Sequence, residues 1–278
     1  MQRKTAVVTG ASNGIGFITA LELARQGARV LMVVRNESKG QASLNMIKAQ
    51  TGQTPELFVA DLSLVAQARR VAEEISLAAP KIDVLVNNAG GIFTERLETS
   101  EGLEMTFALN HMAYFALTTA LLDNLKAAGS ARVVSVSSNA HTMAQLRWDD
   151  LQAKQKFNGT VAYGNSKLMN ILFSNELARQ LEGTGMTSNA LHPGVVATGF
   201  AQNATGAWKW FFSLAKPFLI TPEKGAQTSL YLASSKEIEG ATGLYWDKKR
   251  PVQPSSAALD QTSQKHLWLE SERILATL

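Results

Sequence analysis

The sequence contains no cysteine among its 278 residues, so disulfide bonds and thiolate nucleophiles are excluded. Its histidines are scattered without the spacing of a zinc site, and we expect no bound metal. No uninterrupted apolar stretch reaches the roughly 20 residues that cross a bilayer. The lysines and arginines are dispersed, so a net charge of +4 indicates no nucleic-acid-binding stripe.

The chain also lacks low-complexity linkers and repeats of solenoid length. With 45% hydrophobic and 18% charged residues, it is long enough for one large α/β domain with a substantial core. We expect this domain over residues 1–246 and a C-terminal appendage over 247–278, to which the sequence assigns no function. A strand is predicted within the first few residues, which leaves no room for a signal peptide, so a soluble cytoplasmic protein is expected.

A glycine-rich turn follows the first predicted strand. Residues 5–9 form a short apolar run typical of buried parallel strands, and a helical pattern of apolar residues starts at Ile18. Glycines between them let the backbone approach a pyrophosphate, and the helix N-terminus offers free N–H groups. This context predicts a phosphate cradle, with a simple tight turn as the alternative. The cradle would consist of Gly10, Ser12, Asn13, Gly14, Ile15 and Gly16.

Tyr163 and Lys167 lie four residues apart in a helical pattern, so their side chains emerge on one face. A phenol with a pKa of about 10 is a poor acid or base at neutral pH, and a neighbouring ammonium lowers that pKa. Such a pair can exchange a proton with an alcohol or carbonyl oxygen. Taken alone, the spacing also fits a solvated surface pair. Along the same predicted helix, 163–181, Asn170, Glu176 and Arg179 are expected to mark the polar side.

Three motifs together resemble the short-chain dehydrogenase/reductase family in its single-domain branch. They are the G-x-x-x-G-x-G spacing of the glycine turn, Asn87-Asn88-Ala89-Gly90, and Tyr163-x-x-x-Lys167. The resemblance covers about residues 4 to 246. It implies a doubly wound, Rossmann-type α/β fold with seven parallel strands ordered 3-2-1-4-5-6-7 and helices on both faces. It also implies a possible homodimer or homotetramer.

The cofactor expected from this resemblance is NADP(H), with NAD(H) as the alternative. The family's acidic position after the second strand falls on Val34, and Arg35 follows it, which suits a 2′-phosphate. Arg35 as a plain surface charge is the alternative. Asp61 would accept from the adenine amino group, although it can also cap the next helix. The remaining expected cofactor contacts are Leu62, Asn88, Ala89, Gly90, Tyr163, Lys167, Pro193, Gly194, Val195 and Thr198.

By the same resemblance, four residues carry the chemistry. Tyr163 is the general acid or base, and Lys167 lowers the pKa of its phenol and binds the nicotinamide ribose. Ser138 donates to the substrate oxygen, with Ser137 as the second choice because neighbouring strand residues face opposite ways. Asn110, in a helix predicted over residues 101–126, would hold a relay water through its backbone carbonyl. Its alternative is an amide satisfied within a helix contact.

Two features indicate a lipophilic substrate. The long connection between Ser138 and Tyr163, with Ser137-Ser138-Asn139-Ala140-His141 at its start, resembles the retinol-dehydrogenase-like group of the family. An aromatic-rich stretch at about 199–220 falls where the family has its substrate lid. As alternatives, residues 208–220 would contact a membrane surface, or the stretch would form a subunit or core contact.

The sequence therefore predicts an NADP(H)-dependent oxidoreductase that interconverts an alcohol and an aldehyde or ketone. Two alternatives stay open, a catalytically idle NADP(H)-binding scaffold and an NAD(H)-dependent relative acting on a polar substrate. Sugar epimerisation or dehydration on the same Tyr/Lys pair fits less well, because those enzymes resemble a longer branch with different glycine spacing.

Overall fold

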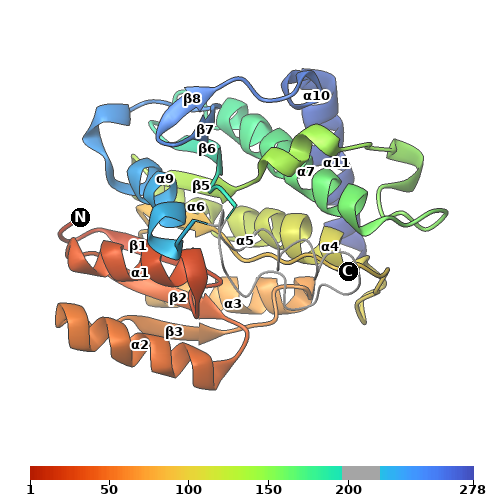
Figure 1. Ribbon diagram of the computed structural model, residues 1–278. Helices are drawn as coiled ribbons and strands as arrows, with labels where there is room; N and C mark the ends of the chain where they lie inside the picture. The colour runs from red at the N-terminus through yellow and green to blue at the C-terminus, as the bar shows by residue number, and fades with distance from the viewer. Residues whose placement is uncertain (196–219) are drawn as a thin grey trace.

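The computed structural model describes residues 1–195 and 220–278, and eight strands of these residues form one sheet (Figure 1). The sheet order is β3-β2-β1-β4-β5-β6-β7-β8, with β1 to β7 parallel and β8 antiparallel to β7. The strands are β1 (Thr5–Thr9), β2 (Arg29–Val34), β3 (Glu56–Val59), β4 (Val84–Asn87), β5 (Arg132–Val136), β6 (Thr187–His192), β7 (Tyr245–Asp247) and β8 (Arg250–Val252). The predicted parallel order is confirmed, and the predicted count of seven is corrected to eight.

The extra strand β8 closes one edge of the sheet as a short hairpin with β7. The turn residues Lys248 and Lys249 both have positive φ values, 49° and 63°, as a two-residue hairpin turn with matching twist requires. Pro251 lacks an N–H group and is tolerated because β8 is an exposed edge strand. Strand β8 is only three residues long and contains a proline, so the sequence carried no recognisable signal for a strand there.

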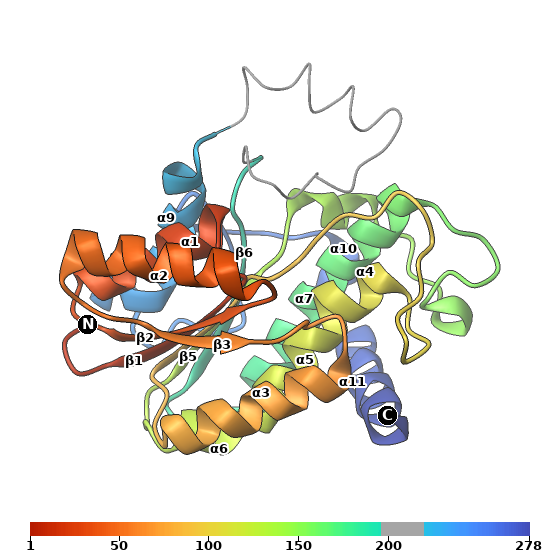
Figure 2. The same ribbon diagram turned by 90° about the horizontal axis from the view of Figure 1, so that it is seen from below.

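Helices cover both faces of the sheet, which is why the central strands are apolar on both sides (Figure 2). One layer contains α1 (Gly14–Arg25), α2 (Glu37–Thr51) and α9 (Pro222–Ser234). The other layer contains α3 (Val65–Ala78), α5 (Ala113–Ala120) and α7 (Gly159–Gln180). Shorter elements are α4 (Met105–Phe107), a π-helix η1 (Ala108–Met112), α6 (Leu122–Lys126), 3₁₀ turns η2 (Asn139–Met143), η3 (Trp148–Asp150) and η6 (Lys236–Ile238), and α10 (Ser256–Leu259). Within the described ranges no helix is long and apolar enough to span a membrane.

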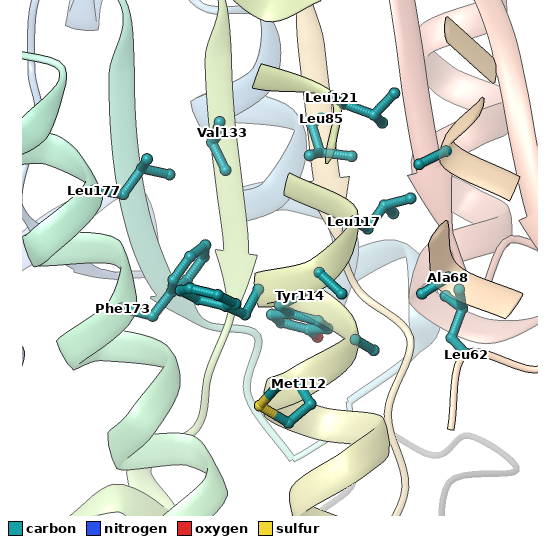
Figure 3. Close-up of a cluster of buried hydrophobic side chains, with 14 of the residues drawn as sticks. Leu62, Ala68, Leu85, Met112, Tyr114, Leu117, Leu121, Val133, Phe173 and Leu177 are labelled. Carbon is teal, nitrogen blue, oxygen red and sulfur yellow. The ribbon is translucent and has the colours of Figure 1, made fainter. Parts of the chain in front are cut away.

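The C-terminal segment forms part of the core. Helix α11 (Gln261–Thr277) packs along the outer side of α7 (Figure 2). Its Trp268 is buried, stacking on Phe173 of α7 at 5.9 Å between ring centroids and meeting Phe115 of α5 edge-on at 4.9 Å. Figure 3 shows Phe173 and Tyr114 in the same apolar cluster. This packing joins the segment after β8 to the helices that carry the site.

Two of the three residues expected on the polar side of α7 are buried in the structure. Asn170 and Glu176 are buried, at 0% and 5% exposure. Asn170 donates to the sheet, while Glu176 pairs with Arg179, which in turn donates to Gln264 of α11 over 2.8 Å. These polar residues therefore connect α7 to its neighbours instead of facing solvent.

Side chains outside the helices determine where the site helices begin. Asn158 accepts from the N–H groups of Thr160 and Val161 at 3.0 and 3.1 Å, which starts α7 one turn before Tyr163. Buried Glu104 caps α4 in the same way, so the helix predicted from residue 101 begins at Met105. A π turn then interrupts the regular α-helical pattern.

Candidate functional site

Because β1 to β6 run parallel, their carboxyl ends meet at one edge of the sheet, and the predicted cofactor segments follow those ends. The glycine turn leaves β1 and enters α1. Gly10 and Gly14 have φ values of 65° and 56°, a region that favours glycine. A Cβ on Gly16 would lie 2.3 Å from the carbonyl oxygen of Gly10, so only glycine fits there.

The N-terminus of α1 has the chemistry of an anion site. The N-cap residue Asn13 makes no side-chain capping hydrogen bond, so no side chain of the cap occupies the first N–H groups of the helix. Those groups and the positive end of the helix dipole suit a pyrophosphate. The backbone of Ser12 is fixed by α2, because the Ser43 hydroxyl donates to the Ser12 carbonyl oxygen at 2.8 Å. The residues present therefore fit a dinucleotide.

Thr9 joins this turn to the loop after β4, a role that the sequence did not reveal. Its Oγ1 accepts from the N–H groups of Asn88 at 2.8 Å and Ala89 at 2.9 Å. The Asn88 carboxamide donates to the carbonyl oxygen of Thr9 at 2.8 Å. The Asn88 side chain thus holds the two loops together, and Asn87, also buried, donates to Thr118 at 2.9 Å.

At the end of β2, Arg35 is exposed and has no hydrogen bond or ion pair within residues 1–195 and 220–278. A guanidinium without an internal partner at this position can bind a phosphate. Asp61, after β3, accepts from the N–H and hydroxyl of Ser63 at 3.0 and 2.7 Å. The structure therefore supports a local turn-forming role for Asp61, while Leu62 is buried in the core.

Tyr163, Lys167 and Ser138 lie together at the ends of β5 and the first turns of α7. The ammonium nitrogen of Lys167 is 5.6 Å from the centroid of the Tyr163 ring. A side-chain hydrogen bond joins Tyr163 to Ser138. Ser138 Oγ also accepts from the N–H of Ala140 at 3.2 Å, which fixes the hydroxyl at the start of turn η2. The three predicted catalytic side chains on β5 and α7 are therefore adjacent.

Burial shifts both ionisable groups toward their neutral forms. It raises the pKa of the Tyr163 phenol well above its usual value, and the hydrogen bond with Ser138 offsets this only partly. It also lowers the pKa of Lys167, which is 2% exposed, to about 7. The expectation that Lys167 lowers the phenol pKa is therefore corrected: burial is the larger influence, and the hydrogen bond with Ser138 is what opposes it. Burial therefore keeps the phenol protonated at neutral pH and makes the phenolate less accessible than in water.

Asn110 lies in the π turn η1, and its carboxamide is fully used inside the protein. The side chain accepts from the N–H of Gly91 at 2.8 Å and donates to its carbonyl oxygen at 2.9 Å. It also donates to Ser166 on α7 at 3.0 Å. A Cβ on Gly90 would lie 3.0 Å from Asn110 Oδ1 and 3.7 Å from Lys167 Nζ. Asn110 therefore braces the β4 loop against α7, and π turns of this kind are frequent at functional sites.

The two serines at the end of β5 have different roles. Ser137 is 1% exposed and donates to the carbonyl oxygen of Lys167 at 2.6 Å, so its hydroxyl is occupied in packing α7 on the sheet. Ser138 faces Tyr163. The two neighbouring hydroxyls therefore face different parts of the protein, as expected, although both serines follow the last residue of β5.

The middle residues of the Tyr163–Lys167 motif also position the site, which sequence reasoning missed. A Cβ on Gly164 would lie 2.9 Å from the carbonyl oxygen of Ala140, so glycine allows turn η2 to approach α7. Asn165 exchanges hydrogen bonds with the backbone of Gln145, accepting at 2.7 Å and donating at 3.3 Å. Ser166 donates to the carbonyl oxygen of Tyr163 at 2.8 Å.

The segment after β6 completes the edge. Gly194 has φ 88° and packs against Ile220, while Val195 is 53% exposed and its carbonyl oxygen accepts from the N–H of Ile220 at 2.9 Å. Pro193 precedes them at the end of the strand. Thr198, nearly all of the expected lid, and most of the stretch considered for membrane contact lie outside the described residues.

Comparisons with known proteins agree with this geometry. A family profile described as short chain dehydrogenase matches residues 4–208. Retinol dehydrogenase 14 of Homo sapiens is 38% identical over 295 residues, covering 100% of this chain and 88% of its own length. A solved structure of an uncharacterized protein from Mycobacterium paratuberculosis has a TM-score of 0.81 at 32% identity, covering 99% of this chain and 94% of that one. A short chain dehydrogenase from Shigella flexneri, complexed with NADP, has a TM-score of 0.71 at 26% identity, covering 90% and 98%.

Proposed function

The chain belongs to the short-chain dehydrogenase family, and on that basis we propose that it is an NADP(H)-dependent oxidoreductase interconverting a lipophilic alcohol and its aldehyde or ketone. The observation that carries this proposal is the adjacency of Ser138, Tyr163 and Lys167 at the carboxyl edge of the sheet. A proton donor, a hydrogen-bond donor for the substrate oxygen and a cation are together beside a dinucleotide-binding turn. An idle cofactor-binding scaffold would not need this set.

When bound, the nicotinamide supplies a hydride to the carbonyl carbon or takes one from the alcohol carbon. The side chains of the protein act on the substrate oxygen. In reduction, Tyr163 gives its phenolic proton to that oxygen, and in oxidation its phenolate takes up the hydroxyl proton. Ser138 donates a hydrogen bond that stabilises negative charge on the same oxygen. Lys167, held by the carbonyl oxygen of Val136 at 3.1 Å, favours the phenolate once the proton has left.

Two observations support NADP(H) over NAD(H). Among the residues that the structure describes, Arg35 has no hydrogen bond or ion pair at the end of β2, where a 2′-phosphate would lie. The preceding residue is Val34 instead of an acid. The Shigella flexneri relative, complexed with NADP, shares this fold at 26% identity. A lipophilic substrate is supported by the similarity to retinol dehydrogenase 14 along the whole chain.

The test is turnover with NADPH and with NADH on a panel of apolar and polar aldehydes and ketones. We expect turnover of apolar carbonyls and a much higher kcat/KM with NADPH. A preference for NADH would overturn the role of Arg35 and leave the catalytic residues in place. Preference for polar carbonyls would overturn the substrate class. Tight NADPH binding without turnover of any carbonyl or alcohol would favour the scaffold alternative.

A further inference from the structure

The turn that follows Ser138 is held by groups from the C-terminal third of the chain. In η2, the Asn139 N–H donates to Nδ1 of His192 at 3.3 Å, and the Asn139 carboxamide oxygen accepts from the Tyr245 hydroxyl at 3.1 Å. The third contact comes from His141, which is 3% exposed and meets Tyr245 edge-on at 5.0 Å. No step of the proposed reaction uses His141.

His141 makes two hydrogen bonds that fix its protonation state. Its Nδ1 lies 2.8 Å from the carbonyl oxygen of Ser138, which can only accept, so Nδ1 carries the proton. Its Nε2 accepts from the N–H of Ser255 at 3.1 Å, so Nε2 carries none. The ring is therefore neutral, in one tautomer. It connects the backbone of Ser138 to the segment before α10.

This connection bears on the oxygen that would meet the substrate. Ser138 Oγ is oriented by the N–H of Ala140 and by Tyr163, and both contacts depend on where η2 lies. Gly164 allows η2 to sit directly on α7, leaving no room for a spacer between the turn and the helix. A shift of the turn would move Ser138 Oγ relative to Tyr163.

We propose that His141 is a positioning residue for Ser138, and that it acts by tying turn η2 to the C-terminal segment through the N–H of Ser255. The inference rests on the proposed function, because it assigns a catalytic purpose to this contact. It also gives the segment after residue 246 a role in the reaction. The segment holds the hydroxyl of Ser138 at the correct position.

Proline at Ser255 removes the N–H donor and puts a ring carbon in the direction of Nε2 of His141, so the two groups are forced apart. Alanine at His141 in the double variant relieves this crowding. Ser255 has φ −58°, which proline adopts without strain. Ser256 supplies the matched control, since it is exposed and is the first residue of α10, a position where proline is well tolerated. Each variant is assayed for kcat, KM, NADPH affinity and thermal unfolding. His141→Ala and the His141→Ala/Ser255→Pro double variant complete a double-mutant cycle for the contact between the two residues.

We expect Ser255→Pro to lower kcat roughly tenfold, because small displacements of a reacting group are costly. NADPH affinity should stay within about twofold, because the turn η2 is separate from the glycine turn of the cofactor site. Ser256→Pro should match the wild type. The double variant should be no slower than His141→Ala alone, because both changes remove one contact. If Ser255→Pro binds NADPH normally and its kcat equals that of Ser256→Pro, the inference is overturned.

A second measurement needs neither a variant nor turnover. Nitrogen-15 NMR of the histidine rings in the wild type should show His141 neutral, with its proton on Nδ1. A proton on Nε2 would remove the Ser255 contact and with it the inference, even if Ser255→Pro fails to fold. Failure of the proposed function is distinguishable, because it would appear as a wild type that turns over no carbonyl or alcohol while His141 keeps the stated tautomer.

Discussion

Lys167 and Asn170 donate to the same acceptor, since Nζ of the lysine and Nδ2 of the asparagine each lie 3.1 Å from the carbonyl oxygen of Val136. The Lys167 ammonium thus shares a neutral carbonyl oxygen with the Asn170 carboxamide. No carboxylate of the described residues forms an ion pair with this ammonium. This arrangement places the lysine rigidly beside Tyr163 but stabilises its charge poorly. Burial therefore lowers the pKa of Lys167 to about 7.

The first prediction concerns stability against pH. Lys167 has a pKa of about 7 in the folded state and about 10.4 when unfolded, so the unfolded chain binds more protons between these values. Stability from this residue therefore rises with pH across that window. In urea unfolding, the wild type should gain roughly 2 kcal/mol relative to Lys167→Met between about pH 7 and pH 9. If the free energies of unfolding of the two proteins change with pH in parallel, Lys167 does not have a lowered pKa in the folded state.

A second prediction isolates the phenolic hydroxyl. Tyr163→Phe keeps the ring and removes the proton donor, so kcat should fall by roughly 10²- to 10⁴-fold. NADPH affinity should change by less than about threefold, because most cofactor contacts are elsewhere. Tyr231→Phe, on helix α9, serves as the control: its hydroxyl donates to Glu237 at 3.0 Å, away from the residues assigned to the site, so turnover should be unchanged. Comparable rates for the two variants would refute the role of Tyr163.

Arg35 allows a third prediction, measured as a difference between two cofactors. Arg35→Ala should weaken NADPH binding by about tenfold to a hundredfold, the value of one charge-assisted contact, and leave NADH binding nearly unaltered. Arg273→Ala, which removes another exposed arginine on α11, should change neither affinity. Equal losses for both cofactors would show that Arg35 does not read the 2′-phosphate.

A fourth prediction tests the contact between η2 and α7. In Gly164→Ala the new methyl group would meet the carbonyl oxygen of Ala140 at 2.9 Å, and backbone cannot move aside locally. The free energy of unfolding should fall by roughly 1–3 kcal/mol, and kcat should fall as well, because the turn carrying Ser138 shifts. Gly40→Ala is the matched case in α2, where the methyl group would meet side chains of Val34 and Leu57. It should lose stability without losing kcat at saturating NADPH.

The last prediction concerns the packing of α11. Trp268→Ala removes the ring that contacts Phe115 and Phe173, so the free energy of unfolding should fall by about 3–5 kcal/mol. Leu269→Ala, at the next position and 53% exposed, should change it by less than about 0.5 kcal/mol. Chemical denaturation of both variants decides whether this helix stabilises the domain.

The sequence was most informative about features that depend on a few adjacent residues, such as a buried strand or a tight turn. The apolar run at residues 5–9 located β1, and the glycine spacing located the turn between β1 and α1, because both depend on a few adjacent residues. The order of the seven parallel strands came from the family resemblance. Strand alternation predicted that only one of Ser137 and Ser138 could face the substrate, and the family pattern was needed to choose Ser138. The site residues that local patterns could not identify are those paired with distant segments, such as Thr9 with the β4 loop.

Where sequence reasoning was wrong, a distant element was responsible. Asn170 and Glu176 were expected on the polar side of the helix, but both are buried, and Asn170 donates to the carbonyl oxygen of Val136 on β5. The N-terminus of α3 is satisfied by the Glu101 carboxylate, which accepts from the N–H groups of Val65 and Ala66 at 2.6 and 2.9 Å. No pattern within a single helix can reveal such partners.

The hydrogen bond from the N–H of Ile220 to the carbonyl oxygen of Val195 has a consequence for how the domain tolerates substitution at this point. It fastens the residues just after β6 to those just before α9, where Ile220 also lies against Gly194. Because both partners are backbone groups, the contact does not depend on either side chain. Of the changes at these two residues, only proline at Ile220 removes the donor and uncouples α9 from the end of β6.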